Sequence, residues 1–324
     1  MSAVMRQEIE IQPLVRRSVE VIRAGQAPSG AYVASPTFAE YRYCWFRDGS
    51  FIADAMSRVG ETDSAEAFFD WCSRVLLARS HEIRAGKHPH ARYTADGEES
   101  AVEWPTFQLD GLGLWLWAAR EHAARHGTAP ERWQAAAELT TEYLARNWRR
   151  PCIDWWEERE GVHLATLACV WAGLVAWGCD EAEDVLATVA TIDDARLDAS
   201  LLVLDTPLGV RHVEPGCFEP LLSPGGGVHR HLEDTYYGGG EWLLLTALLG
   251  WVHGRQGDRV AAREALEWVA AHAAPEGLLP EQSQDHLLAP EHYGPWVHRW
   301  GDPACPLLWS HAMFLSLAHE LDET

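Results

Sequence analysis

Two glutamates in distinctive surroundings, Glu157 and Glu281, are the side chains of this sequence with the clearest chemical meaning. Glu157 lies in Asp-Trp-Trp-Glu-Glu at 154–158, and Glu281 lies in Gly-Leu-Leu-Pro-Glu-Gln at 277–282. Cleavage of a glycosidic bond needs one carboxylic acid to protonate the departing oxygen and a second carboxylate to act from the other face of the sugar. The pair therefore indicates glycosidic bond cleavage, although neither segment establishes it alone.

The two tryptophans beside Glu157 favour one role for it. Trp155 and Trp156 place an apolar wall next to the carboxyl group. An apolar wall disfavours the ionised carboxylate and raises its pKa, as a general acid at neutral pH requires. The local sequence therefore predicts that Glu157 donates the proton.

Further segments combine aromatic rings with polar groups immediately before expected helices. Arg47 beside Asp48 supplies a fork of donors and a bidentate acceptor that together can hold adjacent sugar hydroxyls. Asp48 alone could equally cap the helix that follows. Trp104 offers a platform with Gln108 and Asp110 as polar contacts, or else a packed aromatic and a cap. A third segment, at 230–242, carries a Tyr-Tyr-Gly-Gly run that is too elaborate for a plain turn.

Composition narrows the class of protein and of partner. The chain has 324 residues, 47% of them hydrophobic and 23% charged, so it can bury a large core as a globular protein. Its net charge of −22 argues against nucleic acid and anionic membranes as partners. Its 17 Trp residues suit stacking on the C–H faces of sugar rings, although most of them are expected in the core. A neutral or cationic substrate fits this charge better than an anionic one.

Cysteine and histidine usage points away from metals and disulfides. The seven Cys residues occur singly, several of them inside apolar runs, and are interpreted as buried free thiols. None of the 16 His residues joins a Cys or a carboxylate in a specific ligand pattern, so we expect no metal and no other cofactor. No signal peptide or membrane span is evident, which favours a cytoplasmic location and leaves the oligomeric state open.

The pattern of apolar residues predicts an all-α protein. Apolar residues recur at helical spacing in many segments, and almost nothing alternates like a long strand. The expected helices span 9–24, 49–59, 63–84, 109–126, 130–148, 163–178, 181–190, 240–256, 258–273 and 306–322, with one or two more within 190–222. Short links predict about six helical hairpins, enough to close an (α/α)6 barrel whose loops on one face hold the site. We expect one domain over 1–324.

Six short motifs follow one another along the chain. They are Tyr-Arg-Tyr-Cys-Trp-Phe-Arg-Asp, Phe-Gln-Leu-Asp-Gly-Leu-Gly, Asp-Trp-Trp-Glu-Glu, Glu-Asp-Thr-Tyr-Tyr-Gly-Gly, Leu-Pro-Glu-Gln and Pro-Leu-Leu-Trp-Ser-His-Ala. The motifs occur in the order found in glucoamylases and related enzymes of glycoside hydrolase family 15, and the chain resembles that family over about residues 35–320. The resemblance implies an (α/α)6 barrel and an inverting, exo-acting hydrolase that removes glucose from the non-reducing end of α-glucosides, with a small α-gluco-oligosaccharide as the expected partner.

The resemblance also assigns roles to individual residues. It makes Glu157 the general acid and Glu281 the general base that activates water, with about 6.5–9.5 Å between the two carboxyl groups. It implies that the terminal glucose is held and walled by Arg47, Asp48, Arg230, Tyr41 and Trp45. It implies that the leaving-group side is lined by Glu158, Trp156, Trp104 and Tyr236.

The departures from the family bear on the substrate. The sequence leaves no room for the N-terminal β-sandwich of bacterial glucoamylases or the starch-binding module of fungal ones, and its interval from acid to base is short. We therefore expect short α-1,6- or α-1,4-linked glucosides rather than starch. A trehalase-type hydrolase is the alternative within the family. A catalytically silent sugar-binding or regulatory protein on the same barrel is the alternative from another class, and an α/α-barrel polysaccharide lyase is disfavoured by the acidic charge.

Overall fold

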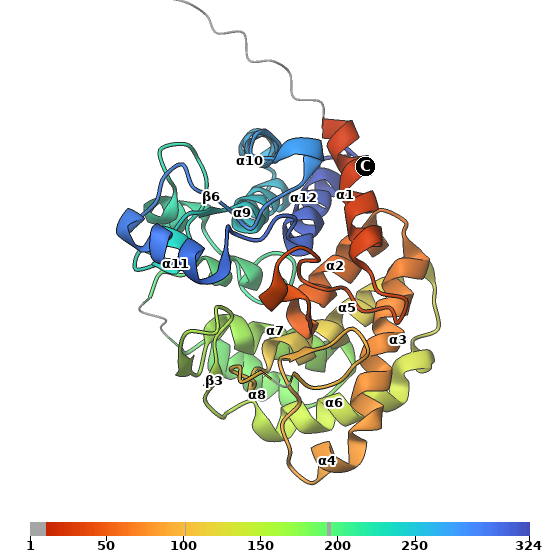
Figure 1. Ribbon diagram of the computed structural model, residues 1–324. Helices are drawn as coiled ribbons and strands as arrows, with labels where there is room; N and C mark the ends of the chain where they lie inside the picture. Colours follow the sequence, from red (N-terminus) through yellow and green to blue (C-terminus); the bar gives the residue numbers. More distant parts are fainter. Residues whose placement is uncertain (1–10, 101, 193–195) are drawn as a thin grey trace, which may run out of the picture.

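The computed structural model describes residues 11–100, 102–192 and 196–324, which form an (α/α)6 barrel (Figure 1). Successive helices alternate between an inner and an outer layer, and the last inner helix packs against the first, which closes the ring. The inner layer consists of α2 (Phe46–Arg58), α5 (Asp110–His126), α7 (Leu164–Ala176), the 3-10 helix η3 (Ala199–Leu204), α9 (Leu243–Arg255) and α12 (Leu308–Glu320). The outer layer consists of α1 (Ile11–Gly25), α3 (Thr62–Ala78), α6 (Gln134–Asn147), α8 (Glu181–Val189), η4 (Pro215–Leu221) and α10 (Arg259–Ala271).

Sequence composition separates the two layers. Helix α9 is apolar on all sides from Leu243 to Val252, and those residues are buried, as expected of a helix surrounded by others. Helix α10 buries one stripe, with Ala262, Leu266 and Val269 facing inward, and leaves its other side half-buried or exposed. Helices that are apolar all round therefore occupy the centre, and amphipathic ones cover them.

Close approach of two inner helices depends on glycine. A Cβ at Gly113 of α5 would lie 2.2 Å from the carbonyl oxygen of Cys169, and a Cβ at Gly173 of α7 would lie 2.6 Å from the carbonyl oxygen of Gly113. Any side chain at these positions would push the helices apart. This contact fixes the spacing between the loops that precede α5 and α7, and both loops carry site residues.

Short antiparallel strands connect the layers at the end of the barrel where the inner helices begin. They form three pairs of two residues each: β1 (Cys44–Trp45) with β2 (Arg92–Tyr93), β3 (Cys152–Ile153) with β4 (Glu160–Gly161), and β5 (Glu241–Trp242) with β6 (Gln282–Ser283). Strands this short leave no periodic signal in a sequence, so none was predicted.

Most predicted helices are confirmed within a few residues, although residues 9 and 10 of the one expected over 9–24 lie outside the described residues. Three differences stand out. The single helix expected over 63–84 breaks into α3 and α4 (Ser80–Arg84). The segment within 190–222, of which 193–195 lie outside the described residues, forms 3-10 helices instead of α-helices; Pro207 and Gly209 directly after η3 do not favour a longer helix. Helix α11 (Tyr293–Trp300) lies between two expected helices, in an interval where no helix was expected. Gly294 and Pro295, at the start of α11, are residues that usually favour a loop.

The remaining 3-10 turns are short and lie in the loops. They are η1 (Ala39–Tyr41), η2 (Pro130–Trp133), η5 (Tyr236–Gly238), η6 (Pro275–Gly277) and η7 (Pro290–His292). Among the described helices, none is both long enough and apolar enough to cross a lipid bilayer.

Candidate active site

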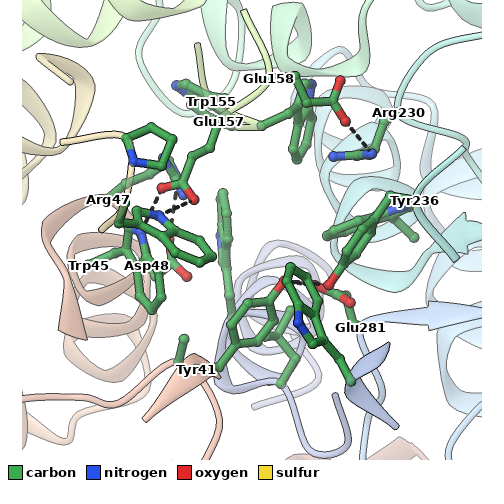
Figure 2. Close-up of a pocket in the computed structure, with 18 of the residues that line it drawn as sticks. Tyr41, Trp45, Arg47, Asp48, Trp155, Glu157, Glu158, Arg230, Tyr236 and Glu281 are labelled. Carbon is green, nitrogen blue, oxygen red and sulfur yellow. Dashed lines mark hydrogen bonds and ion pairs between the residues drawn. The ribbon is translucent and has the colours of Figure 1, made fainter. Parts of the chain in front are cut away.

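The loops that enter the inner helices surround a cavity of about 290 Å³ (Figure 2). Its walls are mostly aromatic, with carboxylates and two arginines between the rings. The lining residues are Ala34, Tyr41, Trp45, Arg47, Asp48, Trp104, Pro105, Trp155, Trp156, Glu157, Glu158, Arg230, Thr235, Tyr236, Trp242, Glu281, Trp296, Trp300, Leu307 and Trp309. Such a mixture of flat apolar faces and a few charged groups suits a small sugar.

A strained turn between β3 and β4 directs Glu157 into this cavity. Glu157 has φ 62°, in the left-handed region that non-glycine residues seldom adopt. Asp154 holds the turn, because its Oδ1 accepts hydrogen bonds from the backbone N–H groups of Glu158 at 2.8 Å and Arg159 at 3.2 Å. Strain that the surroundings enforce in this way is typical of functional positions.

The carboxylate of Glu157 is surrounded by N–H donors. Trp45 Nε1 and Gln108 Nε2 donate to Oε1 at 2.7 and 2.9 Å, and Trp104 Nε1 donates to Oε2 at 2.6 Å. Removal from solvent raises the pKa of Glu157 above its ordinary value, while Arg47 and these three donors oppose the rise. Both oxygens of the ionised form therefore already have hydrogen-bond partners.

Glu281 lies across the cavity from Glu157 in a different environment (Figure 2). It directly precedes β6, and its backbone N–H donates to the Ala304 carbonyl at 2.9 Å. The side chain is 2% exposed. Its Oε1 accepts from the Tyr41 hydroxyl at 2.9 Å, and its Oε2 has no hydrogen-bond partner among the described residues. Burial raises the pKa of Glu281 to about 7.

Two tyrosines form a hydrogen-bonded chain that ends at Glu281. The Tyr41 and Tyr236 hydroxyls lie 2.8 Å apart. Because the single proton of Tyr41 is directed to Glu281, Tyr236 must donate to Tyr41. Burial and the charge of Glu281 hold the pKa of both phenols well above the ordinary value, so both remain donors.

Arg47 and Asp48 begin α2 and form a buried ion pair at the cavity wall. Arg47 Nε lies 3.2 Å from Asp48 Oδ1, and each side chain is less than 10% exposed. Neither of these two atoms has a hydrogen-bond partner of good geometry among the described residues. The pair therefore presents a donor and an acceptor side by side that adjacent hydroxyls of a sugar can satisfy.

Arg230 is fixed by carboxylates and aromatic rings. Its Nε and Nη2 donate to the two oxygens of Asp234 at 2.7 and 2.6 Å, and Nη2 also donates to Glu158 at 2.7 Å. The guanidinium lies 5.2 Å from the Trp156 ring centroid and 5.1 Å from that of Trp242. The neighbouring carboxylates raise the pKa of Arg230, which stays charged.

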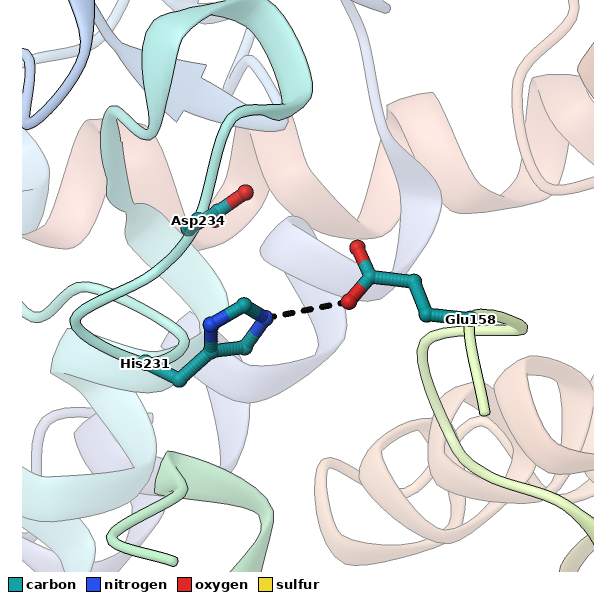
Figure 3. A group of neighbouring side chains, drawn as sticks. All are labelled: Glu158, His231 and Asp234. Carbon is teal, nitrogen blue, oxygen red and sulfur yellow. Dashed lines mark hydrogen bonds and ion pairs between the residues drawn. The ribbon is translucent and has the colours of Figure 1, made fainter. Parts of the chain in front are cut away.

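Glu158 shares a second partner with this group. Its Oε2 lies 3.1 Å from His231 Nε2, and Asp234 lies close to both (Figure 3). These contacts lower the pKa of Glu158 to about 2, since they oppose the effect of its partial burial. Glu158 is therefore an anion that anchors Arg230 and His231 at one side of the cavity.

Comparison with known proteins identifies the family to which this chain belongs. The sequence model of glycosyl hydrolases family 15 matches residues 11–203. The chain belongs to this family. It is 41% identical to an isomaltose glucohydrolase of Kribbella flavida, in an alignment that covers 96% of this chain and 93% of that protein.

Solved structures agree with this membership of family 15. A glycosidase variant crystallised with glucose superimposes with a TM-score of 0.91 at 38% identity, over 99% of this chain and all of that one. A bacterial glucoamylase in complex with acarbose superimposes with a TM-score of 0.71 at 17% identity, over 96% of this chain and 55% of that one, which supports the barrel fold. The family-15 chain is a glycoside hydrolase.

Twelve of the fourteen residues predicted for the site of this hydrolase line the cavity: Tyr41, Trp45, Arg47, Asp48, Trp104, Trp155, Trp156, Glu157, Glu158, Arg230, Tyr236 and Glu281. Gln108 and Asp110 lie behind this surface. Gln108 Oε1 accepts from Arg47 Nη1 at 3.0 Å, and Asp110 Oδ2 lies 3.4 Å from the same nitrogen. Their contacts are with Glu157 and Arg47, so they position the residues that face the cavity.

The indoles that bind Glu157 are not those of the two tryptophans beside it in the sequence. Trp155 packs against Phe51 and Trp309, with ring centroids 5.8 and 5.7 Å apart, and Trp156 donates its N–H to Asp198. The indoles bonded to Glu157 are those of Trp45 and Trp104. The pKa is raised as expected, but by burial of the whole site and against three hydrogen bonds that the sequence did not reveal.

Sequence reasoning missed five tryptophan or arginine side chains around the cavity. Trp242, Trp296, Trp300 and Trp309 line it, and the first and last of these lie within segments that the motifs already covered. Arg92, fully buried on β2, stacks its guanidinium 3.7 Å from the Trp104 ring centroid and 5.2 Å from that of Trp45. No local signal distinguishes Arg92, because only the pairing of β1 with β2 brings it to this place.

Proposed function

We propose that this hydrolase is an inverting, exo-acting α-glucosidase that releases β-glucose from the non-reducing end of short α-glucosides, isomaltose first among them. The observation that carries the proposal is the pair of carboxylates on opposite sides of one cavity, Glu157 bonded at both oxygens and Glu281 with one oxygen unpartnered. Inversion uses two such groups, one to supply a proton and the other to accept one.

In the proposed reaction, Glu157 protonates the glycosidic oxygen as the bond from that oxygen to the anomeric carbon breaks. Water attacks the anomeric carbon from the opposite face and gives its proton to Oε2 of Glu281. The products are β-glucose and the remainder of the substrate with a free hydroxyl. One proton leaves Glu157 and one arrives at Glu281, so a proton exchange with solvent restores the enzyme.

Hydrogen bonding supports this assignment of acid and base. The three N–H donors around Glu157 stabilise the carboxylate that remains after proton transfer to the departing oxygen. The Tyr41 hydroxyl binds one oxygen of Glu281 and leaves the other for water. The burial that raises the pKa of Glu281 to about 7 makes it a stronger base than an ordinary glutamate once ionised.

The cavity and the relatives support a small substrate. A volume of about 290 Å³ lies at the lower end of the range for ligand pockets, roughly 300–1,000 Å³. Trp296 and Trp300 of α11 contribute to its lining and add an aromatic wall for the half of the substrate that leaves. The 41% identity to an isomaltose glucohydrolase over nearly the whole chain favours an α-1,6 linkage.

The experiment is a comparison of isomaltose, maltose, kojibiose, nigerose, trehalose and longer dextrins, with the anomer of released glucose followed by NMR. We expect the highest kcat/KM on isomaltose or a short relative of it, and β-glucose as the first product. Preferred hydrolysis of trehalose would support the trehalase-type alternative instead. Release of α-glucose would overturn inversion, and sugar binding without hydrolysis of any substrate would overturn the proposal as a whole.

A further inference from the structure

A second group of ligand-type side chains lies on the opposite face of the β5–β6 pair from the cavity. Trp242 lines the cavity, and neighbouring residues of a strand point to opposite faces, so Glu241 points away from it. Near Glu241 lie His272, directly after α10, and Asp285, in the loop after β6. One ligand atom from each of these three residues lies within 4.8 Å of the other two.

Glu241 is a buried carboxylate with an unsatisfied oxygen. The residue is 0% exposed. Its Oε1 lies 2.9 Å from His286 Nδ1, while Oε2 has no hydrogen-bond partner among the described residues. The loop above it approaches so closely that a Cβ at Gly227 would lie 2.7 Å from the Glu241 Cβ. An orphaned oxygen on a buried carboxylate is costly, so its position indicates that a cation or a donor belongs beside it.

His272 directs its Nε2 toward the carboxylates of Glu241 and Asp285. Its Nδ1 lies 2.7 Å from the Trp268 carbonyl, which can only accept, so Nδ1 carries the hydrogen. In the neutral ring, Nε2 then holds a lone pair, and it lies 3.3 Å from Asp285 Oδ2. The Trp268 ring stacks on the imidazole with centroids 3.8 Å apart and fixes its orientation. Two facing acceptors need a proton or a metal ion between them.

We propose that Glu241, His272 and Asp285 bind a divalent metal ion, with Zn²⁺ the best match to the donor set. One imidazole nitrogen and two carboxylates are ligands that zinc accepts, whereas Ca²⁺ and Mg²⁺ favour oxygen alone. The charge of the ion balances both carboxylates. A ligating histidine usually donates its other N–H to a backbone carbonyl, as His272 does, and His286 orients the Glu241 carboxylate in the same way.

The position of this site gives the metal a structural role. It joins three segments: the end of α10, strand β5, and the loop that follows β6. Glu281 directly precedes β6, and β6 pairs with β5 through Glu241 opposite Ser283. A metal held here therefore fixes the backbone on which Glu281 stands, from the face opposite the cavity, and touches no reacting group.

The other metal-type group in the described residues, Glu158 with His231 and Asp234, does not carry the same inference (Figure 3). The guanidinium of Arg230 already lies between the two carboxylates, 2.7 Å from one and 2.6 Å from the other. A cation is thus supplied by the chain itself at that place. Near Glu241, by contrast, no arginine or lysine is paired with the carboxylate among the described residues.

The test is a titration of chelator-treated, full-length protein with ZnCl₂, measured by calorimetry and by the thermal melting temperature. We expect one equivalent to bind and the melting temperature to rise. His272→Ala and Asp285→Asn should each weaken zinc binding by at least about tenfold and abolish the rise, and His286→Ala should weaken it by about tenfold as a supporting residue. MgCl₂ and CaCl₂ should bind more weakly than ZnCl₂.

His212→Ala is the matched control, because His212 is an exposed histidine whose two ring nitrogens lie 3.1 Å from Asp205 and 2.9 Å from Glu214. It should leave zinc binding unchanged. Equal binding by wild type, His272→Ala and Asp285→Asn would overturn the proposal. So would a melting temperature that zinc does not change, since that result would show that the three residues hold no metal. Neither result depends on the glucosidase activity.

Discussion

The two sides of the cavity hold the same type of residue in opposite circumstances. Glu157 is only partly buried, lies on a turn with positive φ, and accepts three N–H hydrogen bonds. Glu281 is almost fully buried, lies directly before β6, and accepts one O–H hydrogen bond. The first carboxylate is stabilised as an anion by donors, and the second is left with a free lone pair in a poorly solvated place.

This difference shows that the role of a carboxyl group depends on its partners as well as on its pKa. Burial raises the pKa of both carboxyl groups, and that of Glu281 to about 7. If the carboxyl group with the higher pKa were taken as the general acid, that role would fall to Glu281. The unpartnered Oε2 of Glu281 and the three N–H donors around Glu157 support the reverse assignment, because a base needs an open lone pair and an acid needs its conjugate base stabilised.

The largest expected effect comes from replacing each carboxylate in turn. Glu157→Gln and Glu281→Gln should each lower kcat on isomaltose by about 10²- to 10⁴-fold. On α-glucosyl fluoride, whose leaving group needs no proton, Glu157→Gln should recover most of its activity and Glu281→Gln should not. Steady-state kinetics on both substrates measure this, with Glu160→Gln, at an exposed position of β4, as the control.

If Glu281→Gln recovered activity on α-glucosyl fluoride and Glu157→Gln did not, Glu281 would be the acid and Glu157 the base. Folding of this variant can be checked by its melting temperature. A carboxyl group whose pKa is raised in the folded state costs stability as pH rises from about 4.5 to about 7. Glu281→Gln removes that cost, so it should melt no lower than wild type at pH 8.

A smaller effect is expected from the tyrosine on the Glu281 side. Tyr41→Phe removes the hydrogen bond that lowers the pKa of Glu281, so the pKa should rise further. Since the base must be ionised, the acidic limb of the kcat/KM profile should move to higher pH, with about 10- to 100-fold lower kcat/KM at pH 7. Tyr32→Phe removes a buried hydroxyl bonded to Ser64 outside the cavity and is the control. An unmoved acidic limb in Tyr41→Phe would show that Glu281 does not set it.

The smallest effect is expected on the Glu157 side. Trp104→Phe removes one of three donors, and because these donors lower the pKa of Glu157, the pKa should rise. The acid must be protonated, so the basic limb of the profile should move to higher pH while the acidic limb stays in place. Trp45 and Gln108 still bind the other oxygen, and kcat should fall by about tenfold or less. A shift of the acidic limb instead would contradict the separation of the two sides.

Motifs made the cavity-facing residues predictable, because most of the motifs precede or begin an inner helix and all inner helices begin at one end of the barrel. Arg47 and Asp48 at the start of α2, and Trp104 before α5, follow this rule. Glu281 does not, because β6 and α11 separate it from the next inner helix, α12, and only its own motif indicated it. Arg92, behind the cavity surface, lies in none of the motifs. Arg92 reaches Trp104 only through the β1–β2 pairing, and a two-residue strand has no periodicity to reveal it.

The helical fold, the family and the choice of Glu157 and Glu281 as candidates could be predicted from the sequence, because apolar periodicity and ordered motifs are properties of the chain read in order. What surrounds each carboxylate could be seen only in the folded barrel. Hydrogen bonds from Trp45 and Trp104 to Glu157 span 112 and 53 positions, and the bond from Tyr41 to Glu281 spans 240. The same holds for Glu241, His272 and Asp285, which become neighbours only when α10 and the β5–β6 pair close on each other. Burial and hydrogen bonding arise from contacts between distant segments, and those contacts exist only once the barrel is closed.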